Sequence, residues 1–156
     1  MKLKPISFTL TVDRKVGVLK TPINIYSTNE FNKNFKKVKS NYIALWDTGS
    51  TMSVISEELA SKLNLEPVGE MLAETAGGKY VAKRYVVSIS LPNRLNIENV
   101  MISSGKLGPG IDLLIGMDII TLGDFAITNY NNKTVFSFRF PSCEVIDFVK
   151  DEKNNR

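Results

Sequence analysis

Hydrophobic and polar residues alternate near the start of the chain, where Ile6, Phe8, Leu10 and Val12 are separated by serine and threonine. Alternation with a period of two is typical of a β-strand that buries one face. Shorter apolar segments recur along most of the sequence. They predict further strands over residues 16–19, 23–26, 42–46, 97–102 and 111–115.

Two hairpins are predicted where turn residues separate apolar segments. The first spans residues 71–92 and has its turn at 76–78, because a Gly-Gly pair accepts the positive φ angles of tight hairpin turns. The second lies within residues 125–140, with apolar segments on either side of an Asn-Asn turn at 131–132.

Two short helices complete the predicted elements. Ser56 is a good N-cap residue, and Glu57 and Glu58 would lie in the first turn, where the helix dipole favours acidic side chains. A second helix is predicted over residues 116–122. The polar stretch 27–40, rich in lysine and asparagine, is expected to be a surface loop.

Together these elements indicate an all-β fold with one or two short helices. A length of 156 residues is enough for one domain with its own hydrophobic core. We expect that domain to span residues 1–146. The charged segment 147–156 is expected to be a disordered tail.

The composition removes several kinds of chemistry. The chain has no histidine, which excludes Ser-His-Asp and Cys-His catalysis in their usual forms and histidine-dependent zinc sites. Its one cysteine, Cys143, cannot form an intrachain disulfide and is expected to be an inert small residue. In an enzyme of this composition, carboxylates, hydroxyls, lysines or backbone groups would have to carry the reaction.

The net charge of +4 is mild, and lysines gather in one place, at Lys33, Lys36, Lys37 and Lys39. Few aromatic residues lie nearby, so a solvated loop is favoured over a nucleic-acid-binding face. No apolar run is long enough to span a bilayer. The N-terminal alternation is a strand pattern and not a signal-peptide core. We therefore expect a cytoplasmic protein that binds neither membranes nor nucleic acids.

Asp47-Thr48-Gly49 is the stretch with the most specific chemistry. It follows the apolar run Tyr42–Trp46 and precedes Ser50 and Thr51, so one carboxylate is expected at a tight turn behind a buried strand. Glycine lets the backbone approach the carboxyl group closely because it has no Cβ. A structural alternative is an Asx-turn, in which the Asp47 side chain bonds only to its own backbone.

This stretch resembles the active-site loop of the retropepsin-like aspartic proteases, which have a single lobe per chain. Two further segments resemble the same family in order and spacing. Gly77-Gly78 stands where the family has its flap hairpin, and Leu114-Ile115-Gly116-Met117-Asp118 stands where it has an apolar strand, a glycine and a short helix. The resemblance covers roughly residues 40–125. It implies a retropepsin-like acid protease barrel lobe of the bacterial or cellular type.

The resemblance also implies a set of roles. The family uses two facing aspartates, and this chain has one Asp-Thr-Gly, so a symmetric homodimer with one Asp47 from each subunit is implied. Thr48 would bond across the two-fold axis, the Gly49 amide would orient the carboxylate, and Ser50 would donate a further hydrogen bond to it. The substrate-binding residues would be Ser50, Thr51, Ala76, Gly77 and Gly78.

Two positions depart from the viral members of the family. Those proteases commonly have an acidic residue and an arginine that brace the dimer, at the positions of Thr51 and Met117, so that ion pair cannot form here. We expect Asp118 to be a charge at the helix N-terminus. Asp112 is expected to point to solvent or to the dimer interface, and Trp46 to pack in the core beside the site.

The resulting hypothesis is an aspartic endopeptidase that hydrolyses peptide bonds through a water activated by two Asp47 carboxylates. Its substrate would be an extended peptide segment, and it would need no cofactor and no metal. The alternative is a catalytically silent peptide-binding or assembly domain with the same fold. A third hypothesis, a basic nucleic-acid-binding β-domain, would predict binding that weakens steeply with salt.

Overall fold

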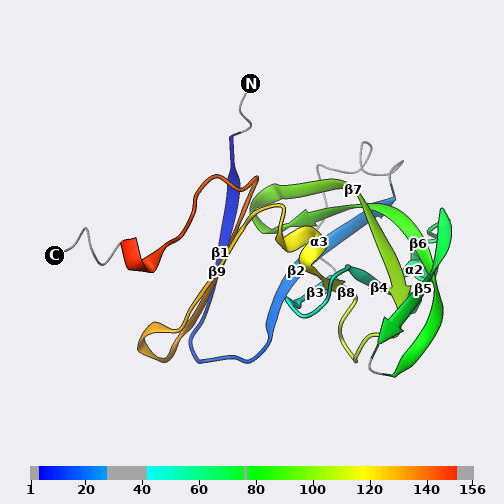
Figure 1. Cartoon of the computed structure of the whole chain (residues 1–156), viewed down its shortest axis with the longest axis horizontal. Helices are drawn as coiled ribbons and strands as arrows, with labels where there is room; N and C mark the ends of the chain where they lie inside the picture. Colours follow the sequence, from blue (N-terminus) through cyan, green and yellow to red (C-terminus); the bar gives the residue numbers. More distant parts are fainter. Residues whose placement is uncertain (1–3, 28–41, 76, 151–156) are drawn as a thin grey trace.

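The computed structural model describes residues 4–27, 42–75 and 77–150 of the chain (Figure 1). Within these ranges the protein is built mostly of strands. The strands are β1 (Ile6–Val12), β2 (Leu19–Ser27), β3 (Tyr42–Trp46), β4 (Val54–Ser56), β5 (Gly69–Thr75), β6 (Gly78–Leu91), β7 (Leu95–Gly105), β8 (Leu113–Ile115), β9 (Asp124–Thr128) and β10 (Thr134–Phe140). The helices are α2 (Glu57–Lys62) and α3 (Met117–Ile120), with 3-10 turns η1 (Pro92–Arg94) and η2 (Tyr130–Asn132).

Six strands close into a barrel. Their order is β2-β3-β8-β4-β7-β6, and β6 pairs in turn with β2, which closes the ring. β5 extends the sheet beyond β6 and forms a hairpin with it, at the right of Figure 1. The expected all-β barrel with short helices is confirmed. Its interior is filled by fully buried aliphatic side chains that include Ile23, Ile55, Ile89, Ile102, Leu113 and Ile115.

A second sheet, of order β1-β10-β9, lies beside the barrel and is seen nearly edge-on in Figure 1. Trp46 at the end of β3 joins the two sheets. Its ring centroid lies 5.0 Å from the rings of both Phe136 and Phe138 in β10. Its indole N–H donates a 2.9 Å hydrogen bond to the hydroxyl of buried Thr21 in β2. The predicted core role of Trp46 is therefore confirmed.

The predicted strand over residues 16–19 is wrong, because only its last residue belongs to β2 and the rest form bends and irregular backbone. Val18 is exposed, and the Val16 amide donates to the Thr134 hydroxyl at 3.1 Å, so the apolar residues here form no buried strand face. β4 was not predicted, since three residues are too few to show a period. β8 and α3 are shorter than the sequence indicated.

The other predicted elements are present, including both hairpins and the helix capped by Ser56, whose side chain accepts a hydrogen bond from the Leu59 amide. The predicted loop 27–40, with its lysines, lies outside the described residues except for Ser27. In the predicted tail, residues 148–150 form a helical turn and residues 151–156 are not described. The division into a domain over 1–146 and a tail stays a prediction.

Candidate functional site

Asp47 follows β3 directly, at the point where this strand leaves the barrel. β3 runs parallel to β8, and Trp46 pairs with Ile115. The Asp47 amide then donates a 2.9 Å hydrogen bond to the Ile115 carbonyl. This pairing fixes the point at which the backbone turns. Asp47 is half-buried and begins a loop that starts at the paired ends of β3 and β8.

The Asp47 loop, residues 47–53, folds back on its own carboxylate. The Gly49 amide donates to Asp47 Oδ1 at 2.8 Å, and the Ser50 amide donates to the Asp47 carbonyl at 3.2 Å. A Cβ on Gly49 would lie 3.1 Å from Asp47 Oδ1, so a larger residue would crowd this contact. Among the described residues, no hydrogen-bond donor reaches Oδ2. The loop thus orients one carboxylate oxygen and leaves the other without a hydrogen-bond donor from these residues.

Ser50 differs from the prediction. Its hydroxyl donates to the Met52 carbonyl at 2.8 Å, inside the loop, and not to Asp47. A hydroxyl has one hydrogen to donate, so it cannot serve the carboxylate at the same time. The oriented carboxylate in this chain therefore depends on the Gly49 amide, whose predicted contact is present. The same contact is the hydrogen bond of the Asx-turn that the sequence offered as the structural alternative.

The loop is also fastened to the start of α3. The Met117 amide donates to the Ser50 carbonyl at 2.8 Å. Gly116 makes this approach possible, because a Cβ there would lie 2.7 Å from the backbone of Met52. Asp118 lies in the first turn of α3, as predicted, but its carboxylate also binds Ser53, which the sequence did not indicate.

Thr48 and Thr51 are exposed beside Asp47, and Met117 is half-buried. Because threonine and methionine side chains carry no charge, no ion pair joins positions 51 and 117. Asp112 has a contact that the sequence did not indicate: its carboxylate accepts a 2.8 Å hydrogen bond from the Ile43 amide and so fastens the start of β3.

The β5–β6 hairpin stands where the flap was predicted. Thr75 pairs with Gly78, which has φ of 112°, a conformation that favours glycine. Gly77 is exposed at the turn, whereas Ala76 lies outside the described residues. The hairpin is fastened to β7 through Tyr80, whose hydroxyl donates to the Ser104 carbonyl at 3.3 Å. Gly77 and Gly78 thus belong to a separate element from the Asp47 loop.

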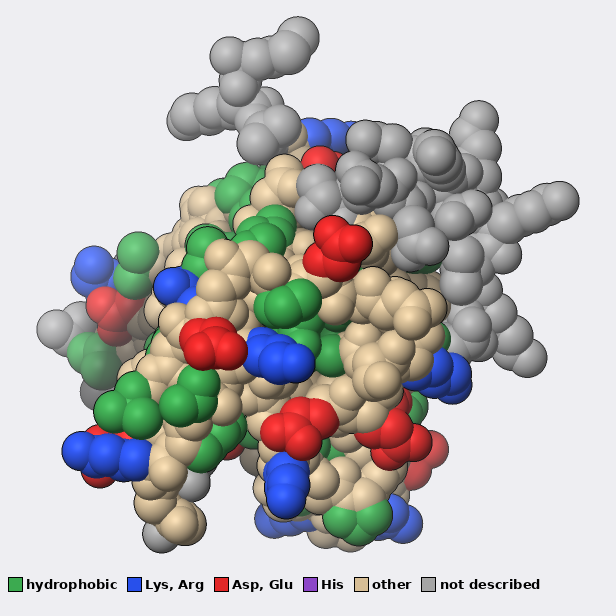
Figure 2. All heavy atoms as spheres, turned by 90° about the vertical axis from the view of Figure 1, so that its right-hand side faces the viewer, with side chains coloured by type: hydrophobic (Ala, Val, Ile, Leu, Met, Phe, Trp, Pro, Cys, Tyr) green, Lys and Arg blue, Asp and Glu red, His purple; other side chains and the backbone are tan. Residues whose placement is uncertain are grey.

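The β5–β6 hairpin carries charges of both signs. Figure 2 shows acidic and basic side chains interspersed on the side of the molecule where β5, β6 and α2 lie. The cross-strand pairs Glu70↔Lys83 and Glu74↔Lys79 contribute to this pattern. A continuous basic stripe of the kind that follows a nucleic-acid backbone is not visible on this face.

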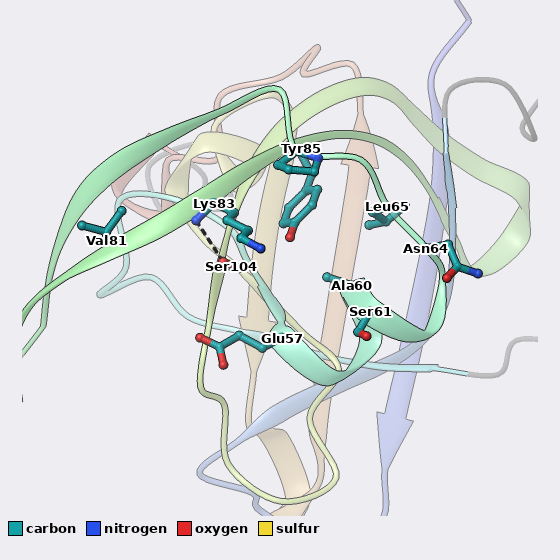
Figure 3. Close-up of a pocket in the computed structure, with 10 residues that line it drawn as sticks. Glu57, Ala60, Ser61, Asn64, Leu65, Val81, Lys83, Tyr85 and Ser104 are labelled. Carbon is teal, nitrogen blue, oxygen red and sulfur yellow. Dashed lines mark hydrogen bonds between the residues drawn. The ribbon is translucent and has the colours of Figure 1, made fainter.

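A cavity of about 590 Å³ lies between α2 and the hairpin (Figure 3). Glu57, Lys83 and Tyr85 are among its lining residues, and the Lys83 amide donates to the Ser104 hydroxyl at 3.1 Å. Burial raises the pKa of Tyr85, and the Glu57 carboxylate raises it further. None of the predicted site residues lines this cavity, so it is distinct from the Asp47 loop.

Asp124, at the start of β9, anchors the segment that follows β10. Burial acts to raise its pKa, but hydrogen bonds from the Ser142 hydroxyl, the Cys143 amide and the Arg139 guanidinium outweigh it, and the pKa lies below its ordinary value. The Arg139–Asp124 ion pair is 2.7 Å long. Cys143 is an exposed free thiol.

Among the residues that the structure describes, no group of three or more histidine, cysteine, aspartate or glutamate side chains could hold a metal ion. No helix among them has the length and hydropathy that a bilayer crossing requires.

Comparisons with known proteins concern the sequence family and the fold. A family model described as aspartyl protease matches residues 36–119, which is more than half of the chain. No curated protein matches the sequence. Among solved structures, a retropepsin-like aspartic protease from Rickettsia conorii is 16% identical, with a TM-score of 0.51 over 90% of this chain and 98% of that chain.

Two further structures are similar at lower TM-scores. The EIAV protease, solved with the inhibitor HBY-793, is 17% identical, with a TM-score of 0.47 over 68% of this chain and 86% of that one. The retroviral protease-like domain of Ddi1 from Leishmania major is 17% identical, with a TM-score of 0.48 over 78% of this chain and 95% of that one. The Rickettsia structure supports the retropepsin-like fold.

Proposed function

Because the chain belongs to the aspartyl protease family, we propose that it is an aspartic endopeptidase that works as a homodimer. The observation that carries this proposal is the Asp47 loop. It presents a carboxylate with one oxygen held by the Gly49 amide at 2.8 Å and the other free of donors among the described residues. Such a carboxylate can accept a proton from water on one side and face a second carboxylate on the other.

The second carboxylate comes from a second copy of the chain. The sequence has one Asp-Thr-Gly, and a two-fold axis beside Asp47 brings two identical loops together. Exposed Thr48 is then available to bond across the axis. Thr51 and Met117 cannot make the ion pair that is common in viral members, so the dimer is held by other contacts.

The reaction follows from two carboxylates at close range. Two carboxyl groups so near each other cannot both be ionised, so the pair shares one proton. This shared proton is the established chemistry of aspartic proteases. The ionised member takes a proton from the attacking water, and the protonated member donates to the scissile carbonyl as the tetrahedral intermediate forms. The chemistry uses no covalent intermediate, no cofactor and no metal.

The substrate is an extended peptide or protein segment. An extended segment can bond through its backbone to the flap hairpin, in which Gly77 and Gly78 allow the turn to move over the site. Ser50 and Thr51 in the loop, together with Ala76, which lies outside the described residues, complete the proposed contacts. A cytoplasmic location remains part of the proposal.

Incubation of the purified protein and Asp47→Asn with a diverse peptide mixture, from acidic to neutral pH, tests the function. Cuts are identified by mass spectrometry. The wild type is expected to cut peptides, and the rate of these cuts should fall by at least about a hundredfold in Asp47→Asn, which keeps its fold because the change is isosteric. If both proteins give the same cuts, or if neither cuts any peptide, the account of a silent peptide-binding or assembly domain is favoured instead.

A further inference from the structure

The Asp47 loop is attached to the segment 115–118 at three points. At its start, the Asp47 amide donates to the Ile115 carbonyl at 2.9 Å. In its middle, the Ser50 carbonyl accepts from the Met117 amide at 2.8 Å. At its end, the Ser53 amide donates to Asp118 Oδ2 at 2.8 Å. The first two contacts are between backbone groups, and the third depends on a side chain.

Ser53 is the junction of this third attachment. It is fully buried, and its hydroxyl donates to Asp118 Oδ1 at 2.7 Å while it accepts from the Gly116 amide at 3.0 Å. Both carboxylate oxygens of Asp118 are therefore used, and Oδ1 also accepts from the Ile119 amide at 2.9 Å. Hydrogen bonds to an ionised acceptor are stronger than neutral ones, and buried networks lose most when one member is removed.

We infer that Ser53 and Asp118 are positioning residues for Asp47, an inference that rests on the proposed function. The Asp118 carboxylate holds the exit of the loop, while backbone pairing with Ile115 holds its entry. With both ends fixed, the Gly49 amide stays at hydrogen-bond distance from the Asp47 carboxylate. Neither positioning residue touches the substrate.

The position of this brace is consistent with the absence of the viral ion pair. Thr51 and Met117 cannot brace the loop by charge, whereas Ser53 and Asp118, close by on the same two segments, do so within one subunit. The brace therefore predicts a loop that is already ordered before the second copy binds.

A matched control is available in Asp112. Its carboxylate also accepts a backbone N–H at 2.8 Å, from Ile43, but at the opposite end of β3 from Asp47. Asp112→Ala and Asp118→Ala therefore both remove a carboxylate that fastens the backbone. Only Asp118→Ala releases the loop.

The kinetic test compares Asp118→Ala, Asp118→Asn, Ser53→Ala and Asp112→Ala at a temperature where each is folded. For the Asp118 and Ser53 variants kcat should fall about 10–100-fold while KM changes little, since misplacing a reacting group by about 1 Å has effects of this size. Asp118→Asn should be the mildest, because its amide oxygen still accepts from Ser53. Asp112→Ala should keep the wild-type kcat. Equal kcat losses in Asp112→Ala and Asp118→Ala overturn the inference.

A second readout does not depend on cleavage. Amide hydrogen exchange, followed by NMR, reports on the Gly49 and Ser50 N–H groups of the loop. Asp118→Asn and Ser53→Ala should speed their exchange by about tenfold or more, and Asp112→Ala should not. If the wild type cleaves no peptide but these rates change as expected, the proposed function fails and the brace stands. Unchanged rates in the Asp118 and Ser53 variants contradict the brace itself.

Discussion

Gly116, the residue before α3, lies against the Asp47 loop. Its amide donates to the Ser53 hydroxyl at 3.0 Å, and the atoms that a side chain would meet are backbone atoms of Met52 and Ser50. Backbone can yield only by moving the whole loop. The glycine of the apolar-Gly segment is thus required by packing against the candidate site, a reason that the sequence pattern alone did not supply.

Gly116→Ala should lower the free energy of unfolding by about 1–3 kcal/mol or more, because its Cβ would lie 2.7 Å from the Met52 backbone. Urea denaturation measures the change. Gly17→Ala is the control, since a Cβ there meets nothing within 4 Å, and its stability should be unchanged or slightly higher. Equal changes in the free energy of unfolding for the two variants would show that the close approach at Gly116 is not the reason why this position needs glycine.

The Ser53–Asp118 contact shows which part of the site a sequence can miss. The two residues are far apart along the chain, and only the antiparallel pairing of β4 with β8 brings their segments together. β4 itself has three residues and no visible period. By contrast, Asp47, Gly49 and Gly116 were recognisable, because each belongs to a short motif next to an apolar strand.

At the scale of elements, strands with a clear alternation or apolar run were predicted well. Tyr42–Trp46 has the predicted bounds, and so does β1, but in β1 only Phe8 is buried, and Ile6 and Val12 are exposed. The strand predicted over residues 16–19 was wrong because the apolar residues there are exposed or lie in irregular backbone. Closure of the barrel depends on the pairing of β2 with β6, and no local pattern encodes such a long-range contact.

The anchor at the start of β9 should make stability depend on pH. The pKa of Asp124 is lower in the folded protein than its ordinary value, so its stabilising contribution is present above the unfolded-state pKa of about 4 and is lost as the pH falls through the folded-state value. Asp124→Asn should therefore lower the urea midpoint at neutral pH, and the difference from wild type should shrink below about pH 4.

Asp13→Asn is the control for this prediction. Asp13 pairs with Lys133 at 2.7 Å, but both side chains are largely exposed, so little change is expected at any pH. A difference between Asp124→Asn and wild type that stays constant from pH 7 to about pH 3 would mean that the carboxylate charge is not what matters.

At the scale of the whole molecule, one chain supplies half of the proposed site. The barrel, the Asp47 loop and the β5–β6 hairpin belong to one chain, but the proposed chemistry needs two carboxylates and the chain has one Asp-Thr-Gly. Family membership, the retropepsin-like fold and the loop geometry all agree with this account. Its central claim is that each active unit contains one Asp47 from each of two chains.

Activity in mixtures of wild-type and Asp47→Asn chains tests that claim most directly. The two proteins are mixed at constant total concentration, allowed to exchange subunits and assayed on a peptide that the wild type cleaves. If both Asp47 carboxylates are needed, activity should follow the square of the wild-type fraction, reaching about one quarter in an equal mixture. Activity that falls in direct proportion to the wild-type fraction would mean that each chain works alone, and it would contradict the account.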